Sequence, residues 1–437
     1  MKSPGSNPYR ETEVYIVDGR RTPQLKARGA PGPFQASDLA VGAARQLLLT
    51  QPFAPDELDE VIFGCVSSGP DEANIARVIA LRLGCGDRVH AMTVQRNCAS
   101  GMQALDTAAS RIASGQAELI LAGGTEAMSH HPVLLGEAMV AWLGQWNQAR
   151  SPGQRIKALG MLKPAYLRPV IALLRGLTDP VTGLSMGQTA EQLAEDFGID
   201  REAMDRFALR SHQRLAAALE AGHLDEIVPL HDREGKLYDR DDGLRADSTI
   251  EKLARLKPVF DRPFGKVTAG NSAQVSDGAA CLLLASAGAV ERHGLPVLGR
   301  LRDCQWAGLE PERMGLGPVH AMAPIMRRHD LDSGDIDYWE INEAFAAQVL
   351  ACLEAWRNED FCRQALDLPH AFQPIPEDRL NVDGGGISLG HPVGASGARI
   401  VLHLLRVLAR EDARLGMASL CIGGGQGGAM LIERIPS

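Results

Sequence analysis

The feature that most constrains this fold is an alternation of short apolar strands with amphipathic helices. The strands of the first part are apolar on both faces, which is typical of a sheet covered by helices on both sides. Their apolar stretches are residues 13–17, 61–66, 90–94 and 119–124, and helices are predicted at residues 38–49, capped by Ser37, 74–83 and from Cys98 to about residue 114. This rhythm predicts an α/β fold.

The last third of the chain repeats the same rhythm. Strands are predicted at residues 297–301, 338–341, 417–421 and 428–433, with helices at residues 319–329, 343–356 and 395–409. Two further β-like stretches, residues 267–270 and 279–285, precede this repeat. Two α/β halves of similar order favour a duplicated fold. Between them, residues 130–255 are predicted to form loops and helices.

Composition excludes several classes of protein. A chain of 437 residues with 45% hydrophobic and 23% charged residues is typical of a globular enzyme with more than one domain. Its net charge of −9 argues against nucleic-acid binding. Its eight cysteines contain no C-x-x-C pair, which favours a reducing compartment and argues against disulfides or a metal site. With no long apolar run and no secretory signal, we expect a cytoplasmic location.

Residues 138–178 stand out because they are both basic and apolar. They contain six lysines or arginines and no acidic residue. Such a stretch fits a docking surface for a partner or a membrane, and equally a cationic cover over an anionic substrate or a solvated helix face.

Cys98 lies where a predicted strand gives way to a predicted helix. Helix N-termini stabilise anions, so this position is expected to lower the pKa of the thiol and favour a nucleophile. The small residues that follow, Ala99, Ser100 and Gly101, leave room for a substrate. Alternatively, Cys98 is an inert core residue.

Three other stretches carry chemically useful side chains at predicted strand ends or in loops. Asn342 precedes Glu343, and an asparagine there is also suited to cap a helix. His391 lies in a loop with six glycines between Gly384 and Gly397, and it is alternatively a plain turn residue. Cys421 enters a second glycine-rich turn that lacks the P-loop pattern. If they converge with Cys98, these residues supply a nucleophile, a base, an oxyanion hole and a proton donor.

Taken together, these motifs resemble those of the thiolase family along essentially the whole chain. The matching stretches are residues 97–101, 342–345, 390–392 and 421–425, in the order of the family. The resemblance implies a five-layered α-β-α-β-α core of two duplicated halves with an inserted loop domain. The implied segments are residues 1–129 and 256–290 for the first half, 130–255 for the loop domain, and 291–437 for the second half.

By this resemblance, Cys98 carries an acyl group and His391 activates it. Asn342 positions a water in one oxyanion hole, which His391 also lines, while the backbone N–H groups of Cys98 and Gly423 form a second hole. Cys421 is the acid and base. No cofactor is bound permanently, and coenzyme A (CoA) is the co-substrate.

The resemblance also implies contacts to the substrate and to CoA. Met186 lies beside the acyl pocket, Phe345 belongs to the asparagine motif, and Arg245 is implied to meet the CoA nucleotide. Ser272 is the residue available to contact the pantetheine of CoA. Arg245 is alternatively a solvated surface residue and Ser272 a turn residue.

The loop region between Met128 and Met186 is longer than in short-chain acetoacetyl-CoA thiolases, and its basic and apolar insertion resembles that of β subunits of trifunctional β-oxidation complexes. This favours a 3-oxoacyl-CoA thiolase for medium or long chains, with an acetyl-CoA C-acetyltransferase as the alternative. Residues 138–178 would then dock a hydratase/dehydrogenase subunit or a membrane, and the family suggests a homodimer or a dimer of dimers. A ketoacyl synthase is disfavoured by Asn342 and Cys421, and a non-catalytic scaffold or carrier would have lost a member of the cysteine and histidine set.

Overall fold

The computed structural model describes residues 12–436. Five strands of the first half lie in the order β4-β3-β5-β10-β1. Their bounds are Val14–Arg21 (β1), Glu60–Gly64 (β3), His90–Val94 (β4), Leu119–Ala127 (β5) and Ser276–Ser286 (β10). β3 runs parallel to β4 and β5, whereas β10 is antiparallel to β5 and β1.

The second half repeats this arrangement. Its strands lie in the order β12-β13-β14-β11, with bounds Gly299–Gly308 (β11), Tyr338–Ile341 (β12), Leu415–Ile422 (β13) and Gln426–Arg434 (β14). A parallel bridge between Trp339 and Leu380 takes the place of β4. β1 and β11 pair antiparallel, so the two halves form one ten-stranded mixed sheet that also includes β2 (Leu25–Lys26).

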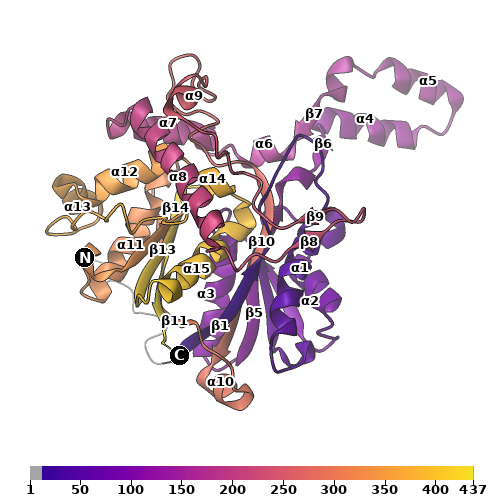
Figure 1. The fold of residues 1–437 in the computed structure, drawn as a ribbon. Coiled ribbons are helices and arrows are strands. Elements are labelled where there is room, and N and C mark those ends of the chain that lie inside the picture. Colours follow the sequence, from indigo (N-terminus) through magenta and orange to yellow (C-terminus); the bar gives the residue numbers. More distant parts are fainter. Residues whose placement is uncertain (1–11, 437) are drawn as a thin grey trace.

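Helices form the other layers (Figure 1). α3 (Ser100–Ala113) and α15 (Val393–Arg410) pack against one face of the strands from both halves. The opposite face is covered by α1 (Ala36–Leu49) and α2 (Ile75–Leu83) in the first half, and by α11 (Gly317–Arg328) and α12 (Ala346–Trp356) in the second. The two halves of the sheet are the two β layers, with α3 and α15 between them and the other helices outside. The order is therefore α-β-α-β-α, which confirms the predicted five-layered core.

The two central helices approach each other through glycines. A Cβ atom on Gly101 would lie 2.9 Å from the carbonyl oxygen of Gly394, and one on Gly397 would lie 2.6 Å from the backbone nitrogen of Met102. A larger residue at either position would push the helices apart. This packing brings the N-terminus of α3 close to that of α15.

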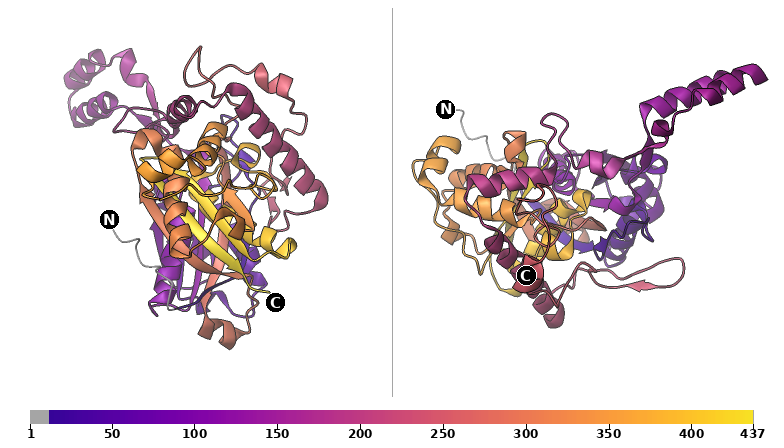
Figure 2. Two further views of the ribbon diagram at one scale, coloured as in Figure 1. Left: turned by 90° about the vertical axis from the view of Figure 1, so that its left-hand side faces the viewer. Right: turned by 90° about the horizontal axis from the view of Figure 1, so that it is seen from above.

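The segment between β5 and β10 forms the loop region. Its helices are α4 (Glu137–Gln148), α5 (Pro152–Gly160), α6 (Ala172–Gly176), α7 (Met186–Asp196), α8 (Arg201–Ala221) and α9 (Ile250–Ala254), with the strand pairs β6 (Val133–Leu135) with β7 (Pro169–Ile171) and β8 (Leu230–His231) with β9 (Leu237–Tyr238). Residues 133–171, called the arm below, project away from the body (Figure 2). Its exposed apolar side chains include Ile156 and Leu167, which are 70% and 60% exposed.

Short helices complete the structure. They are α10 (Ala287–His293), α13 (Glu359–Ala365), α14 (Gly386–Leu389) and six 3-10 helices, η1 (Pro55–Glu57), η2 (Pro70–Glu72), η3 (Met128–His130), η4 (Pro164–Leu167), η5 (Pro311–Leu316) and η6 (Ser333–Asp335). In residues 12–436, no helix combines the length and the hydropathy that crossing a bilayer would require.

Three local predictions were wrong. Ser37 lies inside α1 rather than at its cap, because its side chain is bonded to Glu72 and Arg82. No strand forms at residues 267–270, because the side chain of Asn271 accepts the backbone N–H of Thr268 and closes a turn. The helix predicted at residues 343–356 begins only at residue 346.

Candidate active site

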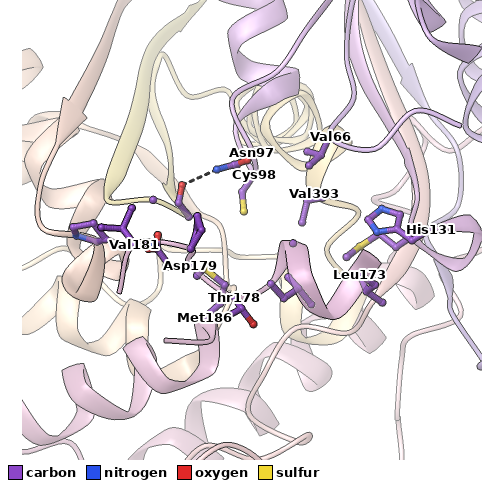
Figure 3. A pocket seen from close by; sticks show the side chains of 17 residues that line it. Val66, Asn97, Cys98, His131, Leu173, Thr178, Asp179, Val181, Met186 and Val393 are labelled. Atoms are coloured by element: carbon purple, nitrogen blue, oxygen red, sulfur yellow. Dashed lines mark hydrogen bonds between the residues drawn. The ribbon is translucent and has the colours of Figure 1, made fainter. Parts of the chain in front are cut away.

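Cys98 lies in the turn between β4 and α3. The preceding residue, Asn97, adopts a left-handed conformation with φ of 44°. Its side-chain amide donates to the carbonyl oxygen of Gly423 at 2.8 Å and so ties this turn to the one that follows β13 (Figure 3). All eight cysteines are unpaired, and Cys98 alone is partly exposed. Its sulfur points into a cavity.

The pKa of the Cys98 thiol differs from the prediction made for a helix N-terminus. Burial raises the pKa, and hydrogen bonds from the backbone N–H groups of Gly423 and of Cys98 itself only partly oppose this effect. The thiol is therefore not ionised in advance, and it needs a neighbouring base to become a nucleophile. The two N–H groups that meet at the sulfur can also stabilise an oxyanion formed there.

His391 is suited to be that base. Its Nδ1 lies 2.6 Å from the hydroxyl oxygen of Ser396, and that hydroxyl donates to the carbonyl oxygen of Pro392 at 3.1 Å. Because the serine has one hydrogen, this assigns the imidazole hydrogen to Nδ1 and leaves Nε2 as an acceptor. Within residues 12–436, Nε2 has no hydrogen-bond partner. Burial lowers the pKa of His391 to about 4, and the charge of Arg399 adds to this, so the ring is neutral at pH 7.

Cys98, His391 and Cys421 line one cavity of about 270 Å³. Cys421 lies at the end of β13 and is 1% exposed. Burial raises the pKa of the Cys421 thiol well above its usual range, and the proximity of Cys98 adds to this effect. The cavity thus holds two protonated thiols and a neutral imidazole. All three groups are uncharged at rest, and they can pass protons to and from a substrate.

Asn342 follows β12 and is 1% exposed. It does not cap a helix, since α12 begins at Ala346. Its backbone N–H donates to the carbonyl oxygen of Ser419, whereas neither atom of its side-chain amide has a partner in the described part of the chain. Asn342 is absent from the cavity lining, although Ala344 and Phe345 line it. A buried amide without partners is unusual and marks a candidate ligand-binding group.

The loop that carries His391 is held by Glu343. This buried carboxylate accepts hydrogen bonds from Ser211 at 2.6 Å, Asn381 at 2.9 Å and the backbone N–H of Ile387 at 3.3 Å. These contacts join α8, Asn381 and α14. Sequence reasoning missed this role, and only the position of Glu343 beside Asn342 signalled it.

The residues expected to contact CoA fall into two groups. Met186, Ser272 and Phe345 line the cavity with Cys98. The hydroxyl of Ser272, however, donates to the carbonyl oxygen of Thr268 at 2.7 Å, as its alternative role in a turn requires. Arg245 lies outside the cavity lining, and its charge lowers the pKa of nearby Lys26 in addition to the effect of burial.

A second cavity of about 280 Å³ shares six lining residues with the first, which are Cys98, Met128, Leu177, Thr178, Met186 and Val393 (Figure 3). Its other lining residues are Val66, Asn97, His131, Leu173, Gly176, Asp179, Pro180, Val181, Pro311, Gly423 and Gly424. Leu173 and Gly176 belong to α6, at the base of the arm, within the stretch of residues 138–178 that the sequence singles out as both basic and apolar. Residues 12–436 contain no cluster of histidine, cysteine, aspartate or glutamate suited to hold a metal ion.

Comparisons with known proteins agree with this geometry. Residues 14–288 match the family "Thiolase, N-terminal domain" and residues 295–434 match "Thiolase, C-terminal domain". The chain is 41% identical to a beta-ketoadipyl-CoA thiolase of Pseudomonas aeruginosa, over 97% of this chain and 99% of that protein. It is also 41% identical to a 3-ketoacyl-CoA thiolase of Erwinia tasmaniensis, over 97% of this chain and 100% of that protein.

Among solved structures, the human mitochondrial 3-ketoacyl-CoA thiolase in complex with CoA is similar, with a TM-score of 0.82 and 35% identity. The match covers 97% of this chain and 98% of that one. The sequence motifs, the duplicated fold and these matches lead to the same conclusion: the chain belongs to the thiolase family.

Proposed function

We propose that this protein is a 3-oxoacyl-CoA thiolase, which cleaves its substrate with CoA into acetyl-CoA and a shortened acyl-CoA, or runs the reverse condensation. The observation that carries the proposal is the single cavity lined by Cys98, His391 and Cys421. The similar structure with bound CoA supports CoA as co-substrate. The alternative is an acetyl-CoA C-acetyltransferase that makes or cleaves acetoacetyl-CoA.

In the first half-reaction, Nε2 of His391 takes the proton of Cys98, and the thiolate attacks the 3-oxo carbon of the substrate. The backbone N–H groups of Cys98 and Gly423 stabilise the oxyanion on the carbon bonded to the Cys98 sulfur. Asn342, through a water, and His391 stabilise the thioester oxygen that becomes the enolate oxygen when the C2–C3 bond breaks, and the buried unpartnered amide supports this role. The C2–C3 bond then breaks. Its electron pair forms the acetyl-CoA enolate, which takes the proton of Cys421 at C2. The shortened acyl group remains on Cys98.

In the second half-reaction, the Cys421 thiolate takes the proton of an incoming CoA thiol. The CoA sulfur attacks the thioester on Cys98, and the backbone N–H groups of Cys98 and Gly423 stabilise the oxyanion. When the intermediate collapses, the acyl-CoA leaves and Cys98 recovers its proton from His391. Met186 and Phe345 are proposed to line the substrate site, with Ser272 near the pantetheine and Arg245 near the CoA nucleotide.

Several wider features belong to the same proposal. Segments 1–129, 130–255, 256–290 and 291–437 are proposed as the domain parts, supported by β10, which lies between β5 and β1 although the loop region precedes it. A homodimer or a dimer of dimers in the cytoplasm is proposed as the working form. The unpaired state of all eight cysteines supports a reducing compartment.

The arm supports a role like that of trifunctional-complex β subunits, with medium or long acyl chains as substrates. The arm carries five cations together with exposed apolar side chains, and Arg175 follows at its base in α6. These features suit an anionic membrane surface or a hydratase/dehydrogenase subunit. Replacing Arg150, Arg155 and Lys157 with glutamine should weaken sedimentation with anionic vesicles or capture of that subunit. If neither changes, the docking role is wrong.

The experiment that tests the activity is thiolysis of two substrates by the purified protein. CoA-dependent cleavage of 3-oxohexadecanoyl-CoA, faster than that of acetoacetyl-CoA, is the expected result. Preference for acetoacetyl-CoA would favour the acetyltransferase. Absence of cleavage with both substrates would favour a non-catalytic scaffold and contradict the proposal.

A further inference from the structure

We infer that this thiolase accepts acyl chains without a charged end and rejects chains that end in a carboxylate. The inference rests on the proposed function and deepens it, because it names the class of acyl chain. It starts from the two cavities that meet at the Cys98 sulfur, since an acyl group bound to that sulfur must extend into one of them.

Neither cavity offers a cation. Among the described residues that line them, none is a lysine or an arginine. Helix α6 illustrates this arrangement, because Leu173, Leu174 and Gly176 line the cavities whereas Arg175 is exposed and lines neither. A substrate carboxylate placed in either cavity would find no arginine or lysine to pair with.

The ionisable side chains in the lining do not substitute for a cation. Asp179 is 4% exposed, and its Oδ1 accepts the backbone N–H groups of Val181 at 2.8 Å and Thr182 at 3.0 Å. Its carboxylate would repel a second one in the same cavity. Nε2 of His131 lies 3.4 Å from Oε1 of Glu126, so a substrate carboxylate would have to compete with Glu126 for this nitrogen. His391 is neutral at pH 7 and acts as the base for Cys98 in the proposed mechanism.

A carboxylate that contacts this apolar lining loses part of its hydration and finds no lysine or arginine there in return, so its binding is costly. An uncharged chain of equal length meets leucine, valine, methionine and proline side chains instead, which favour its burial. We expect the charged end to lower kcat/KM by ~100-fold or more. This preference would separate the protein from the Pseudomonas relative, which is named for a substrate that carries such a carboxylate.

The test compares thiolysis of 3-oxohexanoyl-CoA and 3-oxoadipyl-CoA, whose chains are equally long and differ in the terminal carboxylate. The native protein should favour 3-oxohexanoyl-CoA by ~100-fold in kcat/KM. Equal cleavage, or faster cleavage of 3-oxoadipyl-CoA, would overturn the inference while leaving the proposed thiolase activity intact.

A charge placed in the lining sharpens this test. Val181 is 85% exposed, so Val181→Arg should fold while its guanidinium reaches the cavity. We expect Val181→Arg to lower the ratio of kcat/KM for 3-oxohexanoyl-CoA to kcat/KM for 3-oxoadipyl-CoA by ~10-fold. The uncharged control Val181→Met should leave this ratio unchanged. An equal change in both variants would show that bulk, not charge, sets the ratio, and would contradict the inference.

If neither substrate were cleaved, the proposed function would fail, yet binding would still decide the inference. Dissociation constants for hexanoyl-CoA and adipyl-CoA on Cys98→Ala protein, measured by calorimetry, should favour hexanoyl-CoA. Equal or tighter binding of adipyl-CoA would overturn the inference.

Discussion

Two buried polar clusters of this molecule differ in how their polar atoms are satisfied. The first is an ionic junction formed by Arg21, Glu226, Asp241, Asp383 and His403. The guanidinium of Arg21 bonds Glu226 at 3.0 Å and Asp241 at 2.7 Å, and the ring of His403 bridges Glu226 at 3.1 Å and Asp383 at 3.2 Å. The junction joins β1, the loop region and α15, so its charges hold separate segments together.

The second cluster is the candidate active site. Here Nε2 of His391 and both side-chain atoms of Asn342 are without hydrogen-bond partners in residues 12–436, although both residues are buried. An unsatisfied buried polar group costs free energy, so its presence requires another explanation, such as a ligand. In the junction each charged side chain has at least one partner of opposite charge, although one oxygen of Glu226 has none, whereas in the candidate site Nε2 of His391 and the whole amide of Asn342 are left available to a ligand.

Replacement of Cys98 by alanine should have the largest effect on turnover. Because no other group in the proposed mechanism carries the acyl chain, we expect thiolysis to fall by about 10⁴-fold or more. The matched control is Cys362→Ala, which removes a buried thiol outside both cavities and should retain the native rate. A Cys98→Ala protein with a near-native rate in a CoA-dependent assay would contradict the mechanism.

His391→Ala should lower kcat by about 10³-fold, since the thiol of Cys98 then lacks a base. Ser396→Ala keeps the imidazole but removes the acceptor that holds its hydrogen on Nδ1, and should cost about 10-fold. Because the pKa of His391 is about 4, the native rate should fall with acidification only as the pH approaches that value. Rate profiles against pH would measure this, and an acidic limb near the usual pKa of histidine would argue against a neutral buried ring.

Asn342→Ala should lower kcat by about 10²-fold while changing thermal stability little. The reason is that its amide has no hydrogen-bond partner to lose within the described residues. Steady-state kinetics and a thermal melt on the same sample separate the two effects. A large drop in Tm with unchanged kcat would place Asn342 with the ionic junction rather than with the site.

His403→Ala should show the opposite pattern. Without the imidazolium, Glu226 and Asp383 remain buried with fewer partners, and the free energy of unfolding should fall by roughly 3–5 kcal/mol. Denaturant titration measures this change. An unaltered unfolding midpoint would show that the junction contributes nothing to stability.

The same residue should make stability depend on pH. Burial opposes the charge of His403, but the carboxylates of Glu226 and Asp383 raise its pKa to about 10. The unfolded chain has the usual pKa of about 6.5, so this stabilisation is complete below that pH. It is lost as the pH rises towards about 10. Between these values the native protein should lose more stability than His403→Ala, and equal losses would contradict the assignment.

Much of the fold was predictable because it depends on local patterns. Apolar runs such as residues 119–124 revealed buried strands, and the motifs around Cys98, His391 and Cys421 pointed to one reaction. The failures have local causes too. Thr268 forms a turn because Asn271 captures its backbone N–H, which no alternation of apolar residues reveals.

The rest of the site was hidden because it depends on contacts between distant residues. Asn97 reaches Gly423, Glu343 reaches Ser211, and α6 supplies cavity lining from the base of the arm. The pKa of Cys98 was predicted with the wrong sign, because a helix start is visible in the sequence whereas the burial of a thiol is not.

The most direct test of the central claim is to locate the acyl group on the protein. The native protein would be mixed with hexanoyl-CoA, quenched in acid, digested and mapped by mass spectrometry. The account predicts a hexanoyl thioester on the peptide that contains Cys98, absent from the peptide that contains Cys421, and lost in Cys98→Ala protein. An acyl group on Cys421, or one that persists in Cys98→Ala protein, would contradict it.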